Sequence, residues 1–155
     1  KLTAWKADRK KLADFTKGKK VTNEELIALD VDVLILAALG GVVDETNQAG
    51  VKASYILELA NGPVDDSAEA GLAARGVVIV PDILANAGGV IVSYLEWLQN
   101  MNAESWTLEK VNGELNRYLE EATQQIVARA KTDATSLKDA AFAVAAERIV
   151  AASRA

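Results

Sequence analysis

Three loops rich in glycine and asparagine follow three short apolar segments of the chain. The first loop is Ala37-Ala38-Leu39-Gly40-Gly41, the second is Ala60-Asn61-Gly62-Pro63, and the third carries Asn86 ahead of Gly88-Gly89. Glycine permits close approach of a ligand to the backbone, and an asparagine side chain offers both an amide donor and a carbonyl acceptor. Such groups suit a ribose hydroxyl or a carboxamide. Each loop alone is more readily explained as an ordinary turn, whereas the three together indicate a dinucleotide-binding edge.

The loops share one location only if the apolar segments before them are strands of one sheet. These segments are Val31 to Ala37, Ser54 to Leu59 and Val77 to Val80. The first and third are almost continuously apolar, which is typical of parallel strands covered by helices on both faces. They recur at a roughly constant interval, as repeated strand and helix units require. Since ligands of open parallel sheets bind beyond the carboxyl ends of the strands, we expect the three loops to meet there.

Helices are expected before, between and after these strands. Amphipathic spacing predicts a helix over Lys1 to Thr16, ended by Gly18. Thr22 and Glu25 have the spacing of a capping box, which predicts a short helix after Thr22. Further helices are expected after Asp44, over Ser67 to Arg75 with Gly76 just beyond its end, and over Ala85 to Asn100, Leu108 to Lys131 and Ser136 to Ser153.

The last two helices each carry one apolar stripe, which we interpret as core packing. The stripes are Val111, Leu115, Leu119, Ala122, Ile126 and Ala130 in the first, and Leu137, Ala141, Val144, Ala145 and Ile149 in the second. We therefore expect one α/β domain over residues 1–155, with a strand and helix part in 1–106 and C-terminal helices in 107–155.

Composition narrows the possible chemistry. The chain of 155 residues is 50% hydrophobic and 25% charged, enough for one domain with a core. It has no cysteine and no histidine, which excludes a thiolate nucleophile, a sulfur-ligated metal and the commonest general base. We expect no metal site, and any catalysis would fall to Lys, Asp, Glu, Tyr or Ser.

The charge and the hydropathy of the chain indicate where the protein is located and which partners it lacks. No apolar run approaches the roughly 20 residues of a membrane span, so we expect a cytoplasmic protein without a membrane partner. The net charge of -5 argues against nucleic acid. The first 20 residues carry an excess of lysine and arginine, which we interpret as a solvated helix face instead of a phosphate site.

Four stretches resemble, in order and spacing, the C-terminal half of the glutamate dehydrogenase family, which also includes leucine, phenylalanine and valine dehydrogenases. They are DVDVLILAALGGVV, ELANGP, VVIVPDILANAGGVIVSYLEWLQN and FAVAAERI. PDILANAGGV followed by SYLEW is more similar to the hexameric glutamate dehydrogenases than to the leucine or phenylalanine enzymes. The resemblance implies a partial Rossmann-like nucleotide-binding domain, NAD or NADP as cofactor, an amino-acid substrate and assembly into a homo-oligomer.

The resemblance also implies roles for individual residues. Ala37 and Ala38 would lie along the nicotinamide ribose, and Asn61 would hydrogen-bond the cofactor near that ribose. Asn86 would lie beside the nicotinamide and the substrate. Ser93 matches the serine that glutamate-specific members place on the substrate's side-chain carboxylate. The catalytic lysines and aspartate of the family, and its Gly-rich phosphate turn, match nothing in this chain, so we expect it to be inactive alone.

Three residues depart from the family's usual pattern. Leu36 stands where proline is usual, Leu59 where glycine is usual, and Ile91 where threonine or another small residue is common. All three add apolar bulk near the expected cofactor cleft. The sequence therefore leaves a choice between the nucleotide-binding part of an enzyme that converts L-glutamate to 2-oxoglutarate and ammonia, and a non-catalytic scaffold of the same origin, natural or engineered.

A third hypothesis is an unrelated small-molecule binder. Tyr94, Glu96 and Trp97 follow Gly89 closely enough to line a pocket on the predicted helix. Such residues are more often part of a core or of an interface.

Overall fold

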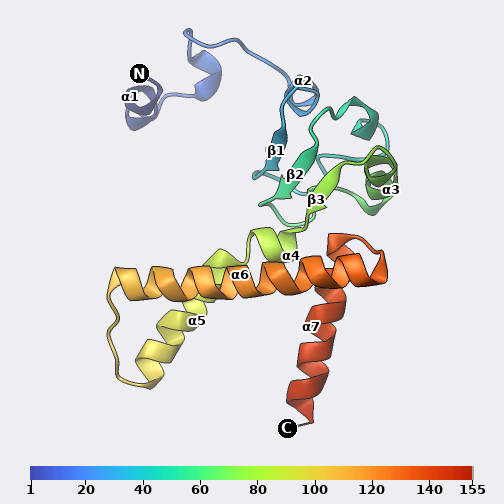
Figure 1. The fold of residues 1–155 in the computed structure, drawn as a ribbon. Helices are drawn as coiled ribbons and strands as arrows, with labels where there is room; N and C mark the ends of the chain where they lie inside the picture. The colour runs from blue at the N-terminus through green and yellow to red at the C-terminus, as the bar shows by residue number, and fades with distance from the viewer. Residues whose placement is uncertain (155) are drawn as a thin grey trace.

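A three-stranded parallel sheet organises the computed structural model, which describes residues 1–154 (Figure 1). The strands β1 (Val33–Leu36), β2 (Tyr55–Glu58) and β3 (Val78–Val80) lie in the order β1-β2-β3. Each strand falls inside the apolar segment that predicted it, so the α/β fold with a parallel sheet is confirmed. Because the strands run in one direction, their carboxyl ends meet at one edge.

Helix α3 (Asp66–Ala74) connects β2 to β3 and packs on one face of the sheet, together with the shorter α2 (Asn23–Ile27) and the 3-10 turn η2 (Gln48–Gly50). Gly76 follows α3 at φ 78°, and its amide bonds the carbonyl of Ala73, which confirms it as the residue just beyond the helix end. The core of this layer consists of Ile27, Leu34, Leu36, Val43, Val51, Ala53, Ile56, Val64, Ala68 and Leu72.

The opposite face of the sheet is largely bare. Side chains alternate along a strand, so Leu34 and Ile56 point into the core while Val33, Ile35 and Tyr55 point away from it. The outward residues remain 48%, 54% and 50% exposed. The expectation that β1 is buried on both faces is therefore wrong, because the helices of residues 1–154 cover only the other side of this strand. The same expectation is wrong for β3, where Val78 is 40% exposed.

A helical layer follows the sheet. Its members are α4 (Asp82–Ala85), α5 (Gly88–Met101), α6 (Leu108–Asp133) and α7 (Leu137–Ser153). The long α6 passes below the sheet and contacts α4, α5 and α7 (Figure 1). Both expected C-terminal helices are present, and Thr107 and Ser136 cap them by accepting backbone amides. A second core joins this layer: Leu84, Ile126, Ala130, Ala140 and Ala141.

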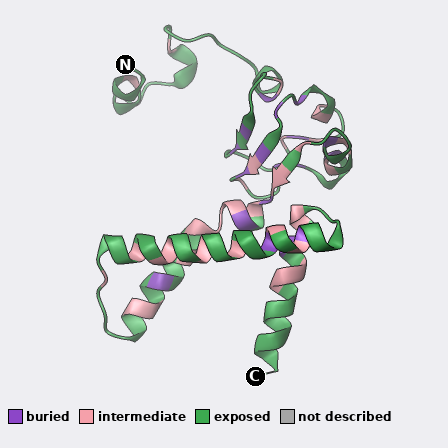
Figure 2. Cartoon of the chain, in the orientation of Figure 1, coloured by how far each residue is buried: buried purple, intermediate pink, exposed green. Residues whose placement is uncertain are grey.

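Two details of the helical layer differ from expectation. The single helix predicted over Ala85 to Asn100 is wrong at its start, because α4 ends at Ala85 and α5 begins only at Gly88. Ile149 was expected in the core stripe of α7, but it is 70% exposed. Figure 2 shows the reason: the C-terminal half of α7 extends away from α6 and is exposed.

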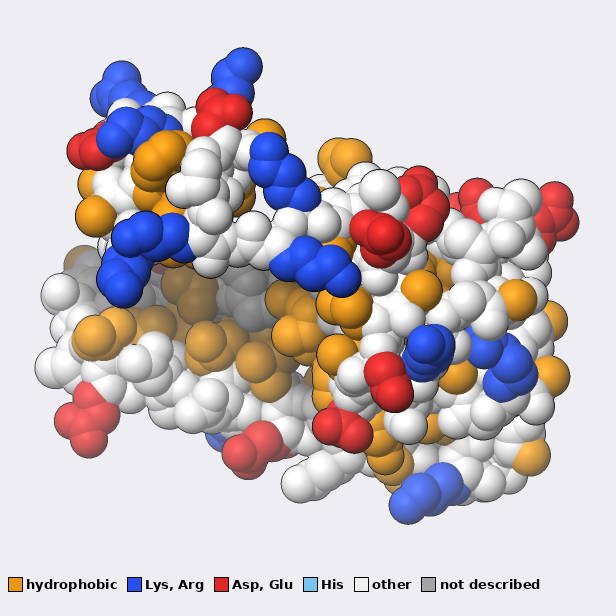
Figure 3. Space-filling view, turned by 90° about the horizontal axis from the view of Figure 1, so that it is seen from above, with side chains coloured by type: hydrophobic (Ala, Val, Ile, Leu, Met, Phe, Trp, Pro, Cys, Tyr) orange, Lys and Arg blue, Asp and Glu red, His pale blue; other side chains and the backbone are white. Residues whose placement is uncertain are grey.

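The predicted helix over Lys1 to Thr16 is also wrong. Helix α1 covers only Leu2–Ala7, and a 3-10 turn η1 covers Leu12–Asp14. Arg9 lies between them in the left-handed region, at φ 56°, where a helix cannot continue. Trp5 and Phe15 instead pack edge to face across this bend, with ring centroids 5.6 Å apart. Lysine and arginine side chains gather over this segment at one side of the molecule (Figure 3).

The expected helix after Asp44 is replaced by a turn. The Asp44 carboxylate accepts the amide of Thr46 at 2.8 Å and its hydroxyl at 2.6 Å, while Asn47 accepts the amide of Asp44 at 3.0 Å. These bonds hold the backbone in a turn that competes with a helix, so only η2 forms. The predicted capping box is confirmed, since Thr22 and Glu25 exchange both hydrogen bonds.

We searched the helices for a segment that could span a membrane. Among residues 1–154, no helix combines the length and the apolar character that crossing a bilayer requires.

Candidate functional site

The loops after β1 and β2 are joined by their backbones. The amide of Gly41 donates to the carbonyl of Gly62 at 2.8 Å, and the amides of Val42 and Val43 donate to the carbonyl of Pro63 at 2.9 and 3.0 Å. Val43 also forms a parallel bridge with Val64. The two loops therefore form one surface at the carboxyl edge of the sheet.

Glycine is required where these loops meet. A Cβ atom on Gly40 would lie 2.9 Å from the carbonyl oxygen of Asn61, closer than real contacts allow. Gly41 and Gly62 adopt the left-handed region, at φ 61° and 53°. These three glycines are thus explained by loop packing and turn geometry, whatever ligand the edge holds.

Two of the predicted site residues contact each other directly. Asn86 donates its side-chain amide to the side-chain oxygen of Asn61 at 2.7 Å, although 25 residues separate them. The same amide lies 3.5 Å from the carbonyl oxygen of Leu59. Within residues 1–154 the amide group of Asn61 and the oxygen of Asn86 keep their hydrogen-bonding capacity. The pair therefore offers a ligand one amide donor group, from Asn61, and one carbonyl acceptor, from Asn86.

The other predicted residues lie around this pair to different degrees. Ala37 and Ala38 follow β1 directly and are exposed. The carbonyl of Leu36, just before them, accepts the amides of Leu59 and Ala60, which places the end of β1 beside the second loop. Ser93 is exposed on α5, and no residue in 1–154 hydrogen-bonds its side chain, so no hydrogen bond links it to the asparagines.

Sequence reasoning missed two carboxylates that fasten the third loop. Asp82, the first residue of α4, accepts the amide of Gly62 at 2.8 Å through its carboxylate. Its own backbone amide donates to the carboxylate of Glu58 at 3.0 Å. One signal pointed to Glu58: it stands two residues after Ile56 on the strand, on the face that the apolar pattern turns inward.

Glu58 is almost fully buried, at 2% exposure. Burial raises the pKa of its carboxyl above the ordinary value, and the nearby charge of Asp82 raises it further. The backbone amides of Asp82 and Val64 and the charge of Lys138 act in the opposite direction but do not cancel the effect.

Of the three residues expected to add apolar bulk near the cofactor cleft, Leu36 and Ile91 pack against other parts of the molecule. Leu36 is 7% exposed and packs into the core under the sheet. Ile91 is half-buried and lines a small cavity of about 220 Å³ with Tyr118 and Leu119 of α6. Leu59 is the one of the three whose side chain is exposed at the carboxyl edge, at 40%.

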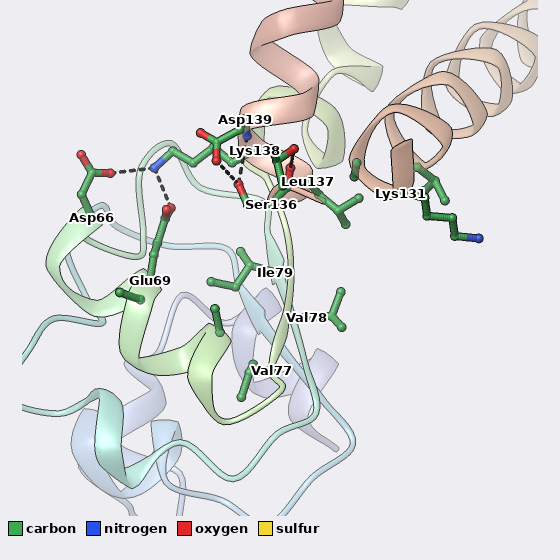
Figure 4. Close-up of a pocket in the computed structure, with 15 residues that line it drawn as sticks. Asp66, Glu69, Val77, Val78, Ile79, Lys131, Ser136, Leu137, Lys138 and Asp139 are labelled. Atoms are coloured by element: carbon green, nitrogen blue, oxygen red, sulfur yellow. Dashed lines mark hydrogen bonds and ion pairs between the residues drawn. The ribbon is translucent and has the colours of Figure 1, made fainter. Parts of the chain in front are cut away.

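A larger groove lies away from this edge. A groove of about 710 Å³ runs between α3, β3 and the junction of α6 and α7. Figure 4 shows Lys138 reaching across it to Asp66 and Glu69, at 2.7 and 2.6 Å. Among residues 1–154, no group of three or more His, Cys, Asp or Glu side chains could hold a metal ion.

The aromatic residues of α5 form an exposed cluster and not a core. Tyr94 stacks on Trp97 with centroids 6.0 Å apart and meets Tyr118 edge to face at 6.4 Å. Tyr94 and Trp97 remain 45% and 54% exposed. They are surface residues of the helical layer.

A parallel sheet with helices on one face, joined loops at its carboxyl edge and paired amides there define a Rossmann-like α/β domain. The family model for Glutamate/Leucine/Phenylalanine/Valine dehydrogenase matches residues 1–155. The chain belongs to this dehydrogenase family, as the sequence motifs indicated.

Individual relatives agree with this assignment. The chain is 47% identical over 132 residues to the NAD-specific glutamate dehydrogenase A of Halobacterium salinarum, a match that covers 85% of this chain and 30% of that protein. The Leu-bound hetero-hexameric glutamate dehydrogenase of Thermus thermophilus superposes with a TM-score of 0.85 at 32% identity, covering 95% of this chain and 34% of that one.

A dehydrogenase named for another amino acid has the same fold. The L-tryptophan dehydrogenase of Nostoc punctiforme gives a TM-score of 0.70 at 28% identity, over 85% of this chain and 38% of that chain. The chain thus spans about a third of the length of the relatives it matches.

Proposed function

We propose that this chain forms the nicotinamide-binding edge of an NAD(P)-dependent glutamate dehydrogenase. The hydrogen bond of 2.7 Å between Asn86 and Asn61 carries the proposal, because it fixes a spare amide donor beside a spare carbonyl acceptor. A nicotinamide carboxamide and a ribose diol each present the complementary groups. Family membership and the likeness to an NAD-specific glutamate dehydrogenase support this choice of ligand.

Each site residue then has a distinct role. The small, exposed side chains of Ala37 and Ala38 leave room for the nicotinamide ribose above the end of β1. Asn61 hydrogen-bonds the cofactor near that ribose, and Asn86 lies between the nicotinamide and the amino acid. Ser93, exposed on α5, binds the side-chain carboxylate of the substrate.

The chemistry assigned to this chain is binding and orientation. A bound nicotinamide supplies the hydride acceptor for oxidation of L-glutamate to 2-oxoglutarate with release of ammonia. The asparagine pair orients the carboxamide and hence the face of the ring that meets the substrate. The catalytic lysines and aspartate of the family match nothing in this chain, and the carboxylates of Asp82 and Glu58 at this edge already accept backbone amides. We therefore expect residues 1–155, one domain with parts 1–106 and 107–155, to be inactive alone.

We further propose that the protein acts as a homo-oligomer. The bare face of the sheet, with Val33, Ile35, Tyr55 and Val78 each at least 40% exposed, supports association because an apolar patch of this kind is unfavourable in water. Sedimentation velocity at increasing concentration should show species larger than the 16.5 kDa monomer. A single monomeric species at all concentrations would contradict assembly of this chain by itself.

A thermal-shift titration with NADH and NADPH to millimolar concentration tests the cofactor proposal. A ligand that binds only the folded chain raises its stability by about 2.7 kcal/mol at 100 times its dissociation constant. We expect a rise in the melting midpoint that depends on cofactor concentration. The Asn61→Ala variant should lose this rise.

The matched control is Asn116→Ala, which removes an exposed asparagine from α6. Its melting midpoint should respond to cofactor as the unchanged chain does. A cooperative melt with no response to either cofactor would instead favour the non-catalytic scaffold.

A further inference from the structure

Glu58 is the charged residue that the described chain, residues 1–154, buries most completely. It ends β2 with its side chain in the core, only 2% exposed. Burying a carboxylate is costly unless hydrogen bonds compensate. The carboxylate accepts the backbone amide of Asp82 at 3.0 Å, from the start of α4.

This bond substitutes for a missing helix cap. Pro81 occupies the N-cap position of α4 and provides no side-chain cap. The first amides of a helix need acceptors from outside the helix. Glu58 supplies one of them from the neighbouring strand, which ties the start of α4 to the end of β2.

The short helix α4 is fastened to the second loop at both of its ends. At its start, the Asp82 carboxylate accepts the amide of Gly62 at 2.8 Å. At its end, Asn86 donates to Asn61 at 2.7 Å. A shift of Asp82 therefore moves Asn86, because only one helical turn separates them.

We infer that Glu58 is a positioning residue, which by holding the amide of Asp82 sets the Asn61–Asn86 pair and so the affinity of this edge for the nicotinamide end of a dinucleotide. The effect on cofactor affinity rests on the proposed function. The control of the asparagine pair by Glu58 does not.

The charges around Glu58 make the arrangement responsive to pH. Asp82 faces it from α4, and Lys138 faces it from α7 while bonded to Asp66 and Glu69 of α3. Protonation of Glu58 weakens its hold on the Asp82 amide, because a charged acceptor bonds more strongly than a neutral one. Burial raises the pKa of Glu58, so this change falls at a higher pH than for an ordinary glutamate.

Nuclear magnetic resonance of the unchanged chain gives the first test. Between about pH 4 and 8, the Asp82 backbone amide and the side-chain amides of Asn61 and Asn86 should shift with one common midpoint above 4.5, the ordinary value for glutamate. In Glu58→Gln that transition should disappear. Asparagine resonances that ignore the Glu58 transition would overturn the inference.

Cofactor affinity gives the second test, with Glu69→Gln as the matched control. Glu69 is a half-buried carboxylate close to the same lysine, but it bonds neither loop. The dissociation constant for NADH should rise about tenfold in Glu58→Gln, which corresponds to about 1.4 kcal/mol. In Glu69→Gln it should change less than about twofold, or about 0.4 kcal/mol. Equal effects in both variants would overturn the inference.

These outcomes separate the inference from the proposed function. If the unchanged chain binds neither NADH nor NADPH, the cofactor proposal fails, while the asparagine resonances still decide whether Glu58 controls the pair. If Glu58→Gln does not melt cooperatively, the pH titration of the unchanged chain still shows whether the Asn61 and Asn86 resonances follow Glu58. A melting midpoint kept at pH 7 together with displaced asparagine resonances would distinguish positioning from a general structural role.

Discussion

Lys138 lies 2.6 Å from Glu69, a residue 69 positions earlier in the chain. Its ammonium group also contacts Asp66 at 2.7 Å. The contacts join the first turn of α7 to α3, and so connect the C-terminal helices to the helix that covers the sheet. Lys138 and Glu69 are 28% and 25% exposed, so solvent screens this pair only in part.

The Lys138→Met variant should be less stable than the unchanged chain. Methionine preserves much of the apolar stem that lies along the groove, so the loss reflects mainly the ion pairs. We expect a decrease of about 1 kcal/mol in the free energy of unfolding, at the upper end for partly exposed pairs. Urea unfolding of both proteins measures it. Lys131→Met, an exposed lysine beside the same groove, should change stability by less than half as much.

The same pair predicts how stability varies with pH. Burial lowers the pKa of Lys138, but hydrogen bonds to Asp66 and Glu69 outweigh it, and the pKa is raised above its ordinary value of 10.5. A raised lysine pKa contributes stability below 10.5, lost as the pH rises through the folded-state value. The difference between the chain and Lys138→Met should thus stay constant from about pH 6 to 10 and shrink only beyond it. A difference that shrinks already between pH 7 and 9 would contradict this account.

Gly40→Ala should damage both stability and the candidate site. Its Cβ atom would lie 2.9 Å from the Asn61 carbonyl oxygen, so the two loops must separate. Overpacking of this kind costs about 1–3 kcal/mol, and it displaces Asn61 from Asn86. Denaturant unfolding and NADH titration should both register the change.

Gly113→Ala is the control, and its effect on stability should have the opposite sign. Nothing lies within 4 Å of a Cβ at this position of α6. Alanine favours a helix over glycine by about 1 kcal/mol, so this variant should be more stable than the unchanged chain. A comparable loss in both glycine variants would show that the clash at Gly40 is unimportant.

The apolar runs and the loop motifs located the sheet and its edge correctly, because strand formation and parallel pairing depend on patterns that are local or regularly repeated. The capping box at Thr22 and the glycine after α3 were equally local and equally reliable. The loop composition singled out the asparagines, and the resemblance to a family supplied their expected roles. The contact between Asn61 and Asn86 depended on the pairing of loops, which no local pattern specifies.

The failures have a common physical origin in competition from tertiary or side-chain contacts. Trp5 and Phe15 have helical spacing, yet they pack across a bend at Arg9. Asp44 could begin a helix, yet its carboxylate bonds the next turn instead. Leu36 was expected near the cleft because it departs from the family pattern, whereas strand alternation directs its side chain into the core. Glu58 was missed because its partner, the backbone amide of Asp82, lies 24 residues later at the start of α4.

Glu58 should leave a signature in the pH dependence of stability. Burial raises its pKa in the folded chain, so the folded state binds this proton more tightly than the unfolded state does. A raised carboxyl pKa contributes stability below the ordinary value of 4.5, and this contribution is lost as the pH rises through the folded-state pKa. Stability measured relative to Glu58→Gln should therefore fall over this window and become constant above it. A relative stability that rises with pH would mean that the amide bonds outweigh burial.

Replacing Leu36 or Leu59 by alanine should lower stability to different extents. Both leucines stand where the family pattern has a smaller or stiffer residue. Leu36 is buried, so Leu36→Ala should cost about 2–5 kcal/mol of unfolding free energy. Leu59 is 40% exposed at the edge, so Leu59→Ala should cost less than about 1 kcal/mol. Denaturant unfolding measures both.

Cofactor titration of the same two variants then locates the obstruction. If bulk at the edge limits access, Leu59→Ala should bind NADH more tightly than the unchanged chain, since its side chain stands beside the carbonyl that Asn86 approaches at 3.5 Å. Leu36→Ala should gain nothing, because its side chain points away from the edge. Tighter NADH binding by Leu36→Ala would contradict this account, because it would mean that the buried leucine, and not the exposed one, limits cofactor access.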